Sequence, residues 1–228
     1  MIYGVMGAMP EEVRLLSGQL RQRSTRRVAD VEFISGIYEG RRVVTCCAGM
    51  GKVNAAAAAQ ILISVFGVQR LVFSGIAGNM SSDLQVGDVV ISTTLCHHDI
   101  DDFTYENTGL VAHDYTADPQ LVAAAAAACR TLGLHALCGR IATGERFIGD
   151  SAAKADIAAR CHPLCVEMEG AAVAQVAEKN GVPFVVIRTV SDNADEAALE
   201  KLVIRQFDVT EYCNTAAAIV QEVMRCTP

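Results

Sequence analysis

The sequence predicts an α/β fold in which helices cover both faces of a central mixed, largely parallel sheet, forming a three-layer αβα sandwich. Two observations favour this architecture. Short apolar segments typical of buried strands alternate along the chain with longer, alanine-rich segments typical of helices. The chain has 228 residues, 51% of them hydrophobic, which is enough to bury a full core. Because no repeat or linker interrupts the pattern, we expect a single domain over residues 1–228.

The expected strands are apolar runs bounded by turn-forming residues. In chain order they span residues 1–6, 31–38, 42–47, 70–74, 88–92, 136–143, 164–166 and 184–190. Glu39-Gly40 is typical of a hairpin turn between the second and third runs. Gly75-Ile76-Ala77-Gly78 is expected to turn the chain after residue 74.

The expected helices carry alanine or an apolar stripe, and Pro10 stands near the first turn of the first of them. They span residues 11–20, 53–66, 121–132, 151–160, 167–179 and 209–224. Four arginines after the first helix are expected to complement its dipole and face water: Arg21, Arg23, Arg26 and Arg27. Residues 97–118 read as one long irregular acidic loop, which is typical of a functional or mobile segment.

Charge and composition exclude several classes of function. Lys and Arg number 19 against 26 Asp and Glu, a net charge of −7, which disfavours binding to nucleic acid or to anionic membranes. Trp is absent, and no segment approaches the roughly 20 apolar residues of a membrane span. The nine cysteines form no disulfide framework and indicate reduced thiols in a cytoplasmic protein.

Five segments that follow expected strands carry the candidate functional residues. They are Gly7-Ala8-Met9-Pro10-Glu11-Glu12, Ala48-Gly49-Met50-Gly51, Gly75-Ile76-Ala77-Gly78, Glu167-Met168-Glu169 and Ser191-Asp192-Asn193. Ligands of open α/β sheets bind outside the carboxyl ends of the strands. If these strands are parallel, the five segments meet at one edge, and three of them bring carboxylates.

The carboxylates have structural as well as chemical interpretations. Asp192, at the rim of a dry core, could be held protonated as a general acid, or could be a turn or N-cap residue. Glu167 and Glu169 fit the start of a helix, where they would point ~200° apart, so that only one could face the cleft. Glu12 alone fits a structural role at a helix start.

Phosphate and metal motifs do not fit the sequence. Gly49-Met50-Gly51 before a helix resembles a phosphate cradle, but Asn54 replaces the third glycine of the dinucleotide pattern and Val53 replaces the P-loop hydroxyl. His97-His98-Asp99 reads as part of a solvated acidic loop. The segment 161–165 has no second ligand pair for zinc. We therefore expect no metal site.

Taken together, five segments resemble the 5′-methylthioadenosine/S-adenosylhomocysteine nucleosidases of the nucleoside phosphorylase superfamily. They are residues 7–12, 48–53, 75–78, 166–172 and 186–192, in the family's order and at fitting intervals, and the resemblance runs from Met1 to about Arg225. It implies a nucleoside phosphorylase-like fold. It also implies hydrolysis of the bond between adenine and a 5′-thio-substituted ribose, without metal or organic cofactor.

The resemblance also assigns roles to individual residues. Asp192 matches the general acid that protonates the leaving adenine, and Glu12 matches the base that activates water, which Arg188 helps to place. Glu169 and Met168 match the residues that hold the ribose, and this selects Glu169 over Glu167 as the ligand of its hydroxyls. The remaining expected substrate-binding residues are Phe147 and Ile148 of the purine wall, Ser191 beside the acid, and Glu167, Met50, Ile76 and Met9.

Some features of the resemblance leave alternatives open. Ile76 replaces a small or hydroxyl residue of many family members, and residues 103–114 and 199–208, including the thioalkyl-pocket candidate Phe207, do not align clearly. The preferred substrate among methylthioadenosine, adenosylhomocysteine and 5′-deoxyadenosine is therefore open. Three other functions remain as alternatives. A phosphorylase is disfavoured by Glu12, which would repel phosphate, and a non-catalytic nucleoside-binding protein is disfavoured by the presence of Glu12, Glu169 and Asp192 together. The third alternative is an aminodeoxyfutalosine nucleosidase. The family implies an adenine nucleoside as the small-molecule partner and a homodimer.

Overall fold

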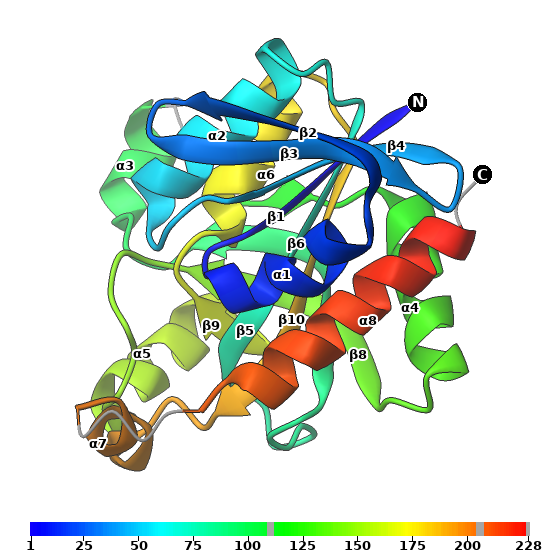
Figure 1. The fold of residues 1–228 in the computed structure, drawn as a ribbon. Helices are drawn as coiled ribbons and strands as arrows, with labels where there is room; N and C mark the ends of the chain where they lie inside the picture. Colours follow the sequence, from blue (N-terminus) through cyan, green and yellow to red (C-terminus); the bar gives the residue numbers. More distant parts are fainter. Residues whose placement is uncertain (109–111, 204–207, 227–228) are drawn as a thin grey trace.

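A curved, ten-stranded sheet runs through the middle of the molecule (Figure 1). The computed structural model describes residues 1–108, 112–203 and 208–226, and Phe207 lies outside the described residues. The strands are β1 (Ile2–Gly7), β2 (Arg21–Val28), β3 (Val31–Tyr38), β4 (Arg41–Cys47), β5 (Arg70–Asn79), β6 (Val89–His97), β7 (Tyr115–Thr116), β8 (Ala136–Thr143), β9 (Cys165–Glu167) and β10 (Phe184–Asp192). The helices are α1 (Pro10–Gln19), α2 (Lys52–Ser64), α3 (Asp102–Thr108), α4 (Pro119–Thr131), α5 (Ser151–Cys161), α6 (Gly170–Lys179), α7 (Glu196–Val203) and α8 (Thr210–Cys226).

The sheet is mixed, and its pairing closes on itself. Strands β4, β1, β5 and β10 are mutually parallel neighbours, so their carboxyl ends lie at one edge. Strand β10 also pairs antiparallel with β6, which continues in parallel through β8 to β9. The short β9 then returns to the end of β5 in antiparallel register, with Val166 opposite Gly78. This return brings the segment after β9 to the same edge as the parallel strands.

Two helical layers cover the sheet, as expected of an αβα sandwich (Figure 1). Helices α2 and α6 pack together on one face, where alanines such as Ala55, Ala59 and Ala174 allow close approach to the strands. Helices α1, α4 and α8 pack on the other face through residues such as Leu16, Leu121 and Ile219. Every residue of β10 is buried, in keeping with the apolar run Phe184–Ile187 with which the strand begins. The predicted fold class is confirmed.

The basic segment after the first helix forms strand β2, so the expectation that its arginines complement the helix dipole is wrong, whereas the expectation that they face water is confirmed. Arg21, Arg23, Arg26 and Arg27 are exposed on this strand, which pairs antiparallel with β3. They do not cap a helix. A strand with no buried side chain lacks the apolar alternation that sequence patterns detect.

Other elements differ from expectation in extent. Strand β5 continues through the predicted Gly75–Gly78 turn to Asn79, because β10 and β9 supply pairing partners there. Strand β6 likewise continues to His97 by pairing with β8. The predicted irregular loop contains α3 and β7, and α7 was not anticipated. Within the described parts of the chain, no helix is long and apolar enough to cross a membrane.

Candidate active site

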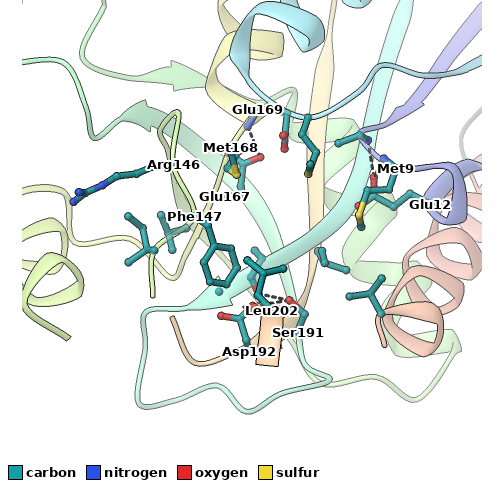
Figure 2. Close-up of a pocket in the computed structure, with 18 residues that line it drawn as sticks. Met9, Glu12, Arg146, Phe147, Glu167, Met168, Glu169, Ser191, Asp192 and Leu202 are labelled. Atoms are coloured by element: carbon teal, nitrogen blue, oxygen red, sulfur yellow. Dashed lines mark hydrogen bonds between the residues drawn. The ribbon is translucent and has the colours of Figure 1, made fainter. Parts of the chain in front are cut away.

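A pocket of about 340 Å³ opens where the carboxyl ends of β1, β5 and β10 meet the segment after β9 (Figure 2). The structure brings eleven of the twelve residues singled out from the sequence to its wall. These are Met9, Glu12, Met50, Ile76, Phe147, Ile148, Glu167, Met168, Glu169, Ser191 and Asp192. The twelfth, Arg188, does not line the pocket. It is 1% exposed and lies beside Glu167 and Glu169.

Other lining residues were not singled out from the sequence. Ala8, Ala77, Gly78 and Val166 lie within or beside the motifs already considered. Arg146 adjoins Phe147 and lines the pocket, but Figure 2 shows its side chain extending away from Glu12 and Asp192. Leu202 of α7 and Val209 complete the wall. The helical spacing of Ala198, Leu199 and Leu202 was the signal that could have identified α7.

Glu12 is held at the start of α1 by backbone donors. Its Oε2 accepts hydrogen bonds from the N–H groups of Ala8 and Met9, at 2.6 and 3.0 Å. The side chain is 4% exposed, and burial raises the pKa of this carboxyl above its ordinary value, although Arg188 opposes the shift. Glu12 is therefore a fixed, water-poor carboxyl group that can bind a proton more readily than an exposed one.

Arg188 stands at the centre of a group of carboxylates. It forms an ion pair with Glu167, its Nη2 lies 3.7 Å from Oε2 of Glu169, and the charge of Glu12 also acts on it. Its guanidinium lies 4.1 Å from the ring centroid of Phe73. A cation enclosed in this way is expensive to desolvate and is stabilised only by its partners. Arg188 is thus fixed in place rather than free to approach a ligand.

Glycine at position 75 allows Arg188 and Glu12 to approach each other. A Cβ atom at this position would lie 2.6 Å from Nη1 of Arg188 and 2.7 Å from Oε1 of Glu12. No real side chain tolerates such contacts with two buried charged groups, so the glycine is required by close approach. Gly75 therefore contributes to the site because it has no side chain. It lies within strand β5 and not in the predicted turn.

Glu167 and Glu169 both line the pocket, contrary to the expectation that only one could face it. The expectation assumed a helix, but Glu167 ends β9 and Glu169 is the N-cap of α6. Glu167 accepts from Thr143, Arg188 and the Gly170 N–H, and its two oxygens are taken up by these protein donors. Oε1 of Glu169 accepts from the Gly51 N–H at 2.8 Å. Burial, followed by the Glu167 charge, raises the pKa of Glu169 to about 7.

Asp192 lies at another side of the pocket, beside Ser191 and near the ring of Phe147 (Figure 2). A register shift between Val190 and Asp192 redirects the end of β10. Oδ2 accepts from the Ser191 hydroxyl at 2.8 Å, and Oδ1 accepts from the Ala194 N–H at 2.8 Å. Burial raises the pKa of Asp192 above its ordinary value. The bond to Ala194 is the turn contact considered from the sequence, and it coexists with a place on the pocket wall.

The first turn of α2 is held by carboxylates from distant segments. Its N-cap, Gly51, supplies no side chain, and the Lys52 N–H donates to Oε2 of Glu145 at 3.1 Å. The Lys52 ammonium binds Asp99 at 2.7 Å, and Asp99 in turn accepts from the Glu145 N–H. This bridge ties the Met50 segment to the loop that carries Phe147. No group of three potential metal-ligating side chains occurs among the described residues.

Comparison with known proteins agrees with this geometry. The sequence model of the phosphorylase superfamily matches residues 2–225. A 5′-methylthioadenosine/S-adenosylhomocysteine nucleosidase of Halalkalibacterium halodurans is 38% identical over 227 residues, 97% of each chain. The chain belongs to this nucleosidase family of the phosphorylase superfamily.

Solved structures of the nucleosidase family share the fold closely. The enzyme of Neisseria meningitidis, in complex with methylthio-immucillin-A, superimposes with a TM-score of 0.93 at 33% identity over 99% of each chain. A futalosine hydrolase mutant of Helicobacter pylori gives 0.91 at 27% identity, again over 99% of each chain. The nucleosidase fold therefore accommodates more than one substrate, and the pocket rather than the fold must decide between them.

Proposed function

We propose that this nucleosidase hydrolyses the N-glycosidic bond of 5′-methylthioadenosine and S-adenosylhomocysteine, releasing adenine and the thio-substituted ribose. The observation that carries the proposal is one pocket with a buried acid, Asp192, on one side and the carboxylates Glu12 and Glu169 on another. Relatives that bear the nucleosidase name support the substrate class. 5′-Deoxyadenosine, which shares the purine and ribose, is a further expected substrate.

Asp192 would act on the leaving group. Cleavage places negative charge on adenine, and a proton delivered to its imidazole ring neutralises that charge. Because burial raises its pKa, Asp192 remains protonated to higher pH than an exposed aspartate. The Ser191 hydroxyl and the Ala194 N–H hold the carboxyl in a fixed orientation. Phe147 and Ile148 would form the apolar wall of the adenine subsite.

The carboxylates would stabilise the ribose as it becomes cationic. Glu12, Glu167 and Glu169 surround one arginine, so negative charge exceeds positive charge at this end when all three are ionised. Excess fixed negative charge favours an oxocarbenium-like transition state over a neutral ground state. Oε1 of Glu169 is occupied by Gly51, which leaves Oε2 to accept from ribose hydroxyls. Met168 would pack against the sugar.

Glu12 would activate the water that attacks the ribose. Backbone N–H groups fix its Oε2, while Oε1 lies next to Gly75 at the pocket wall. An ionised Glu12 accepts a proton from water there, and Arg188 keeps the carboxylate in place electrostatically. The same negative charge repels phosphate, which needs free arginine and backbone donors. The site therefore favours hydrolysis over phosphorolysis.

The proposal is tested by incubating the purified protein with methylthioadenosine and following free adenine by chromatography. Release of adenine and methylthioribose at equal rates with and without inorganic phosphate is the expected result. A ribose 1-phosphate product that requires phosphate would replace the proposal with phosphorolysis. No adenine from any nucleoside, despite nucleoside binding measured by calorimetry, would instead identify a non-catalytic binding protein.

Aminodeoxyfutalosine is the alternative substrate. The structural likeness to a futalosine hydrolase supports it, but the sequence identity of 27% is lower than the 38% to the H. halodurans nucleosidase. A substrate panel that measures kcat/KM for both nucleosides decides between them. A higher kcat/KM for aminodeoxyfutalosine would overturn the preference stated here.

A homodimer is also part of the proposal. Met50, Val53 and Phe103 are 63%, 77% and 71% exposed, which is unusual for large apolar side chains, and Met50 lies on the pocket wall. A second copy that covers them would shield the ribose end of the pocket from solvent. Sedimentation velocity would show a dimer of about twice the 24.2 kDa chain mass, and a monomer at micromolar concentration would contradict the assignment.

A further inference from the structure

A second, smaller cavity of about 80 Å³ holds two cysteines that the proposed reaction does not use. Cys96 comes from the end of β6, and Cys161 is the last residue of α5. His97, Tyr105, Arg140 and Arg160 also line the cavity. Its wall thus combines two thiols with two guanidinium groups, although the two cysteines are far apart in the sequence.

The two thiols lie in the same small part of the fold. Both side chains line this cavity, and both belong to one apolar cluster with Ala142 and Ile157. Nη1 of Arg140 donates to the Cys161 carbonyl at 3.0 Å, and its Nη2 donates to Asp114 at 2.7 Å. These contacts fix the end of α5, which carries Cys161, against β8, the strand that pairs with the Cys96 strand β6.

Cys161 differs from the other thiols of the chain in its charge environment. The neighbouring Cys96 thiol, assisted by the charges of Arg160 and Arg140, lowers the pKa of Cys161 to about 7, although the side chain is buried. The pKa of each of the other cysteines is raised, chiefly by burial or, for Cys96, by the neighbouring Cys161 thiol. A thiolate is the nucleophilic form of cysteine, and among the cysteines Cys161 has the largest thiolate fraction near neutral pH.

We propose that Cys96 and Cys161 are an oxidation site, and that a hydroperoxide converts them to a disulfide. The Cys161 thiolate attacks the terminal peroxide oxygen and breaks the O–O bond, which gives a sulfenic acid and, after protonation, water or an alcohol. The Cys96 thiol then attacks the sulfenic sulfur, the S–S bond forms, and the hydroxyl leaves as a second molecule of water. The two thiols lose two electrons, and the peroxide gains them.

The same apolar cluster links this site to the purine wall of the pocket. Ile148 and Val166 pack in the cluster with both cysteines and also line the pocket. Helix α5, which ends at Cys161, begins three residues after Ile148. A bond between Cys96 and Cys161 therefore constrains the segment that carries Phe147 and Ile148, and we expect a two- to tenfold change in KM. This consequence rests on the proposed function, whereas formation of the bond does not.

The test treats the full-length protein with stoichiometric hydrogen peroxide, blocks the remaining thiols with iodoacetamide, and maps disulfide-linked peptides by mass spectrometry without reduction. Wild type is compared with Cys96→Ser and Cys161→Ser, and with Cys138→Ser, an exposed cysteine, as the matched control. Thermal melting establishes that each variant is folded. The expected result is a peptide linking Cys96 to Cys161 in wild type and in Cys138→Ser, which dithiothreitol removes.

The variants separate the two chemical steps. Cys96→Ser keeps the nucleophile but lacks the second thiol, so dimedone should label Cys161 as the sulfenic acid, whereas Cys161→Ser should give neither product. Wild-type protein in which both thiols remain alkylatable after peroxide, or in which the linked peptides join other cysteines, would overturn the proposal. Because the mapping needs no substrate, it stands even if no nucleoside is hydrolysed.

Discussion

At one end of the pocket Glu12, Glu167 and Glu169 surround the buried cation Arg188, whereas at the other end Asp192 is hydrogen-bonded, among the described residues, to the neutral Ser191 hydroxyl and Ala194 N–H. The carboxyl groups at both ends are buried, and burial raises the pKa of Glu12, Glu169 and Asp192 alike. At the carboxylate cluster, the Arg188 charge and backbone donors oppose that rise. At Asp192 the main opposition comes from the hydrogen bonds of Ala194 and Ser191.

The difference lies in the kind of group that opposes desolvation: a buried cation at the cluster, and hydrogen-bond donors at Asp192. In the proposed reaction, Asp192 would be the proton donor and the cluster would supply negative charge to the ribose. Substitutions that remove the proton, the charge or the cation should therefore affect the two ends in distinct ways.

The largest effect is expected at the purine end. Asp192→Asn retains size and hydrogen bonding but has no acidic proton, so kcat should fall by roughly 10²–10⁴-fold while nucleoside binding persists. Steady-state kinetics and calorimetric binding of methylthioadenosine measure the two effects. Asp83→Asn, an exposed substitution, is the control. Turnover close to wild type in Asp192→Asn would contradict the acid assignment.

At the carboxylate cluster, Glu12→Gln should reduce kcat to a comparable or slightly smaller degree, because the amide cannot accept a proton from water. Glu11→Gln, one residue earlier and outside the pocket lining, should behave as wild type. Azide or formate, small anions added at millimolar concentration, could take the place of the activated water and restore adenine release in Glu12→Gln. A variant with full activity would show that water is activated elsewhere.

Arg188→Met would test whether the cation holds the cluster together. Removing one partner of a buried ion pair typically costs about 3–5 kcal/mol, because the remaining charges are left unpaired. Urea denaturation should show a loss of that size, and Arg188→Met/Glu167→Gln should recover part of it. At the purine end, Ser191→Ala removes a neutral hydrogen bond and should cost about 1 kcal/mol. Equal losses for the two single variants would remove the distinction between the ends.

Sequence patterns predicted which residues line the pocket better than they predicted the elements that connect them. Residues at the ends of β1, β5 and β10 were found because parallel strands must bring their carboxyl ends together. The helical phase that separated Glu167 from Glu169 failed because β9 extends to Glu167 by pairing with β8 and β5. Strand pairing is a long-range interaction, and a local pattern cannot contain it.

Arg188 shows a second limit of sequence patterns, which is that they do not reveal the partners of a buried charge. Its position in a buried, apolar strand gave no sign of the three carboxylates around it, and only the resemblance to the nucleosidase family singled it out. The exposed arginines of β2 formed a conspicuous sequence cluster but lie on an edge strand away from the pocket lining. Charge density along the chain therefore did not single out Arg188, because its place depends on burial among carboxylates from distant segments.

The carboxylate cluster should also respond to pH through Glu169. Since the folded-state pKa of Glu169 is raised to about 7, the folded protein binds more protons than the unfolded chain between the ordinary carboxyl range and pH 7. Stability without ligand should therefore fall as pH rises from about 4.5 to 7. Ribose binding needs the ionised carboxylate, so KM should rise about tenfold for each pH unit below 7.

Thermal melts and KM values for wild type and Glu169→Gln across pH 5–8 test both expectations: as pH rises towards 7, both the stability and the KM of the wild type should fall. The glutamine cannot ionise, so the fall in stability over this window should be smaller in the variant and its KM should change little with pH. A wild-type KM that is constant below pH 7 would show that a neutral Glu169 binds ribose equally well. The raised pKa would then have no part in recognition of the sugar.

The smallest effect is expected from the bridge that positions the ribose end. Glu145→Ala removes the acceptor of the Lys52 N–H, and helix caps of this kind are worth about 0.5–1 kcal/mol, or roughly a two- to fivefold change in an equilibrium. Because Gly51 bonds Glu169, a looser α2 terminus should raise KM by that factor and leave kcat nearly unchanged. Glu178→Ala on exposed α6 surface is the matched control. A fall in kcat with constant KM would instead place Glu145 among the groups that act on the transition state.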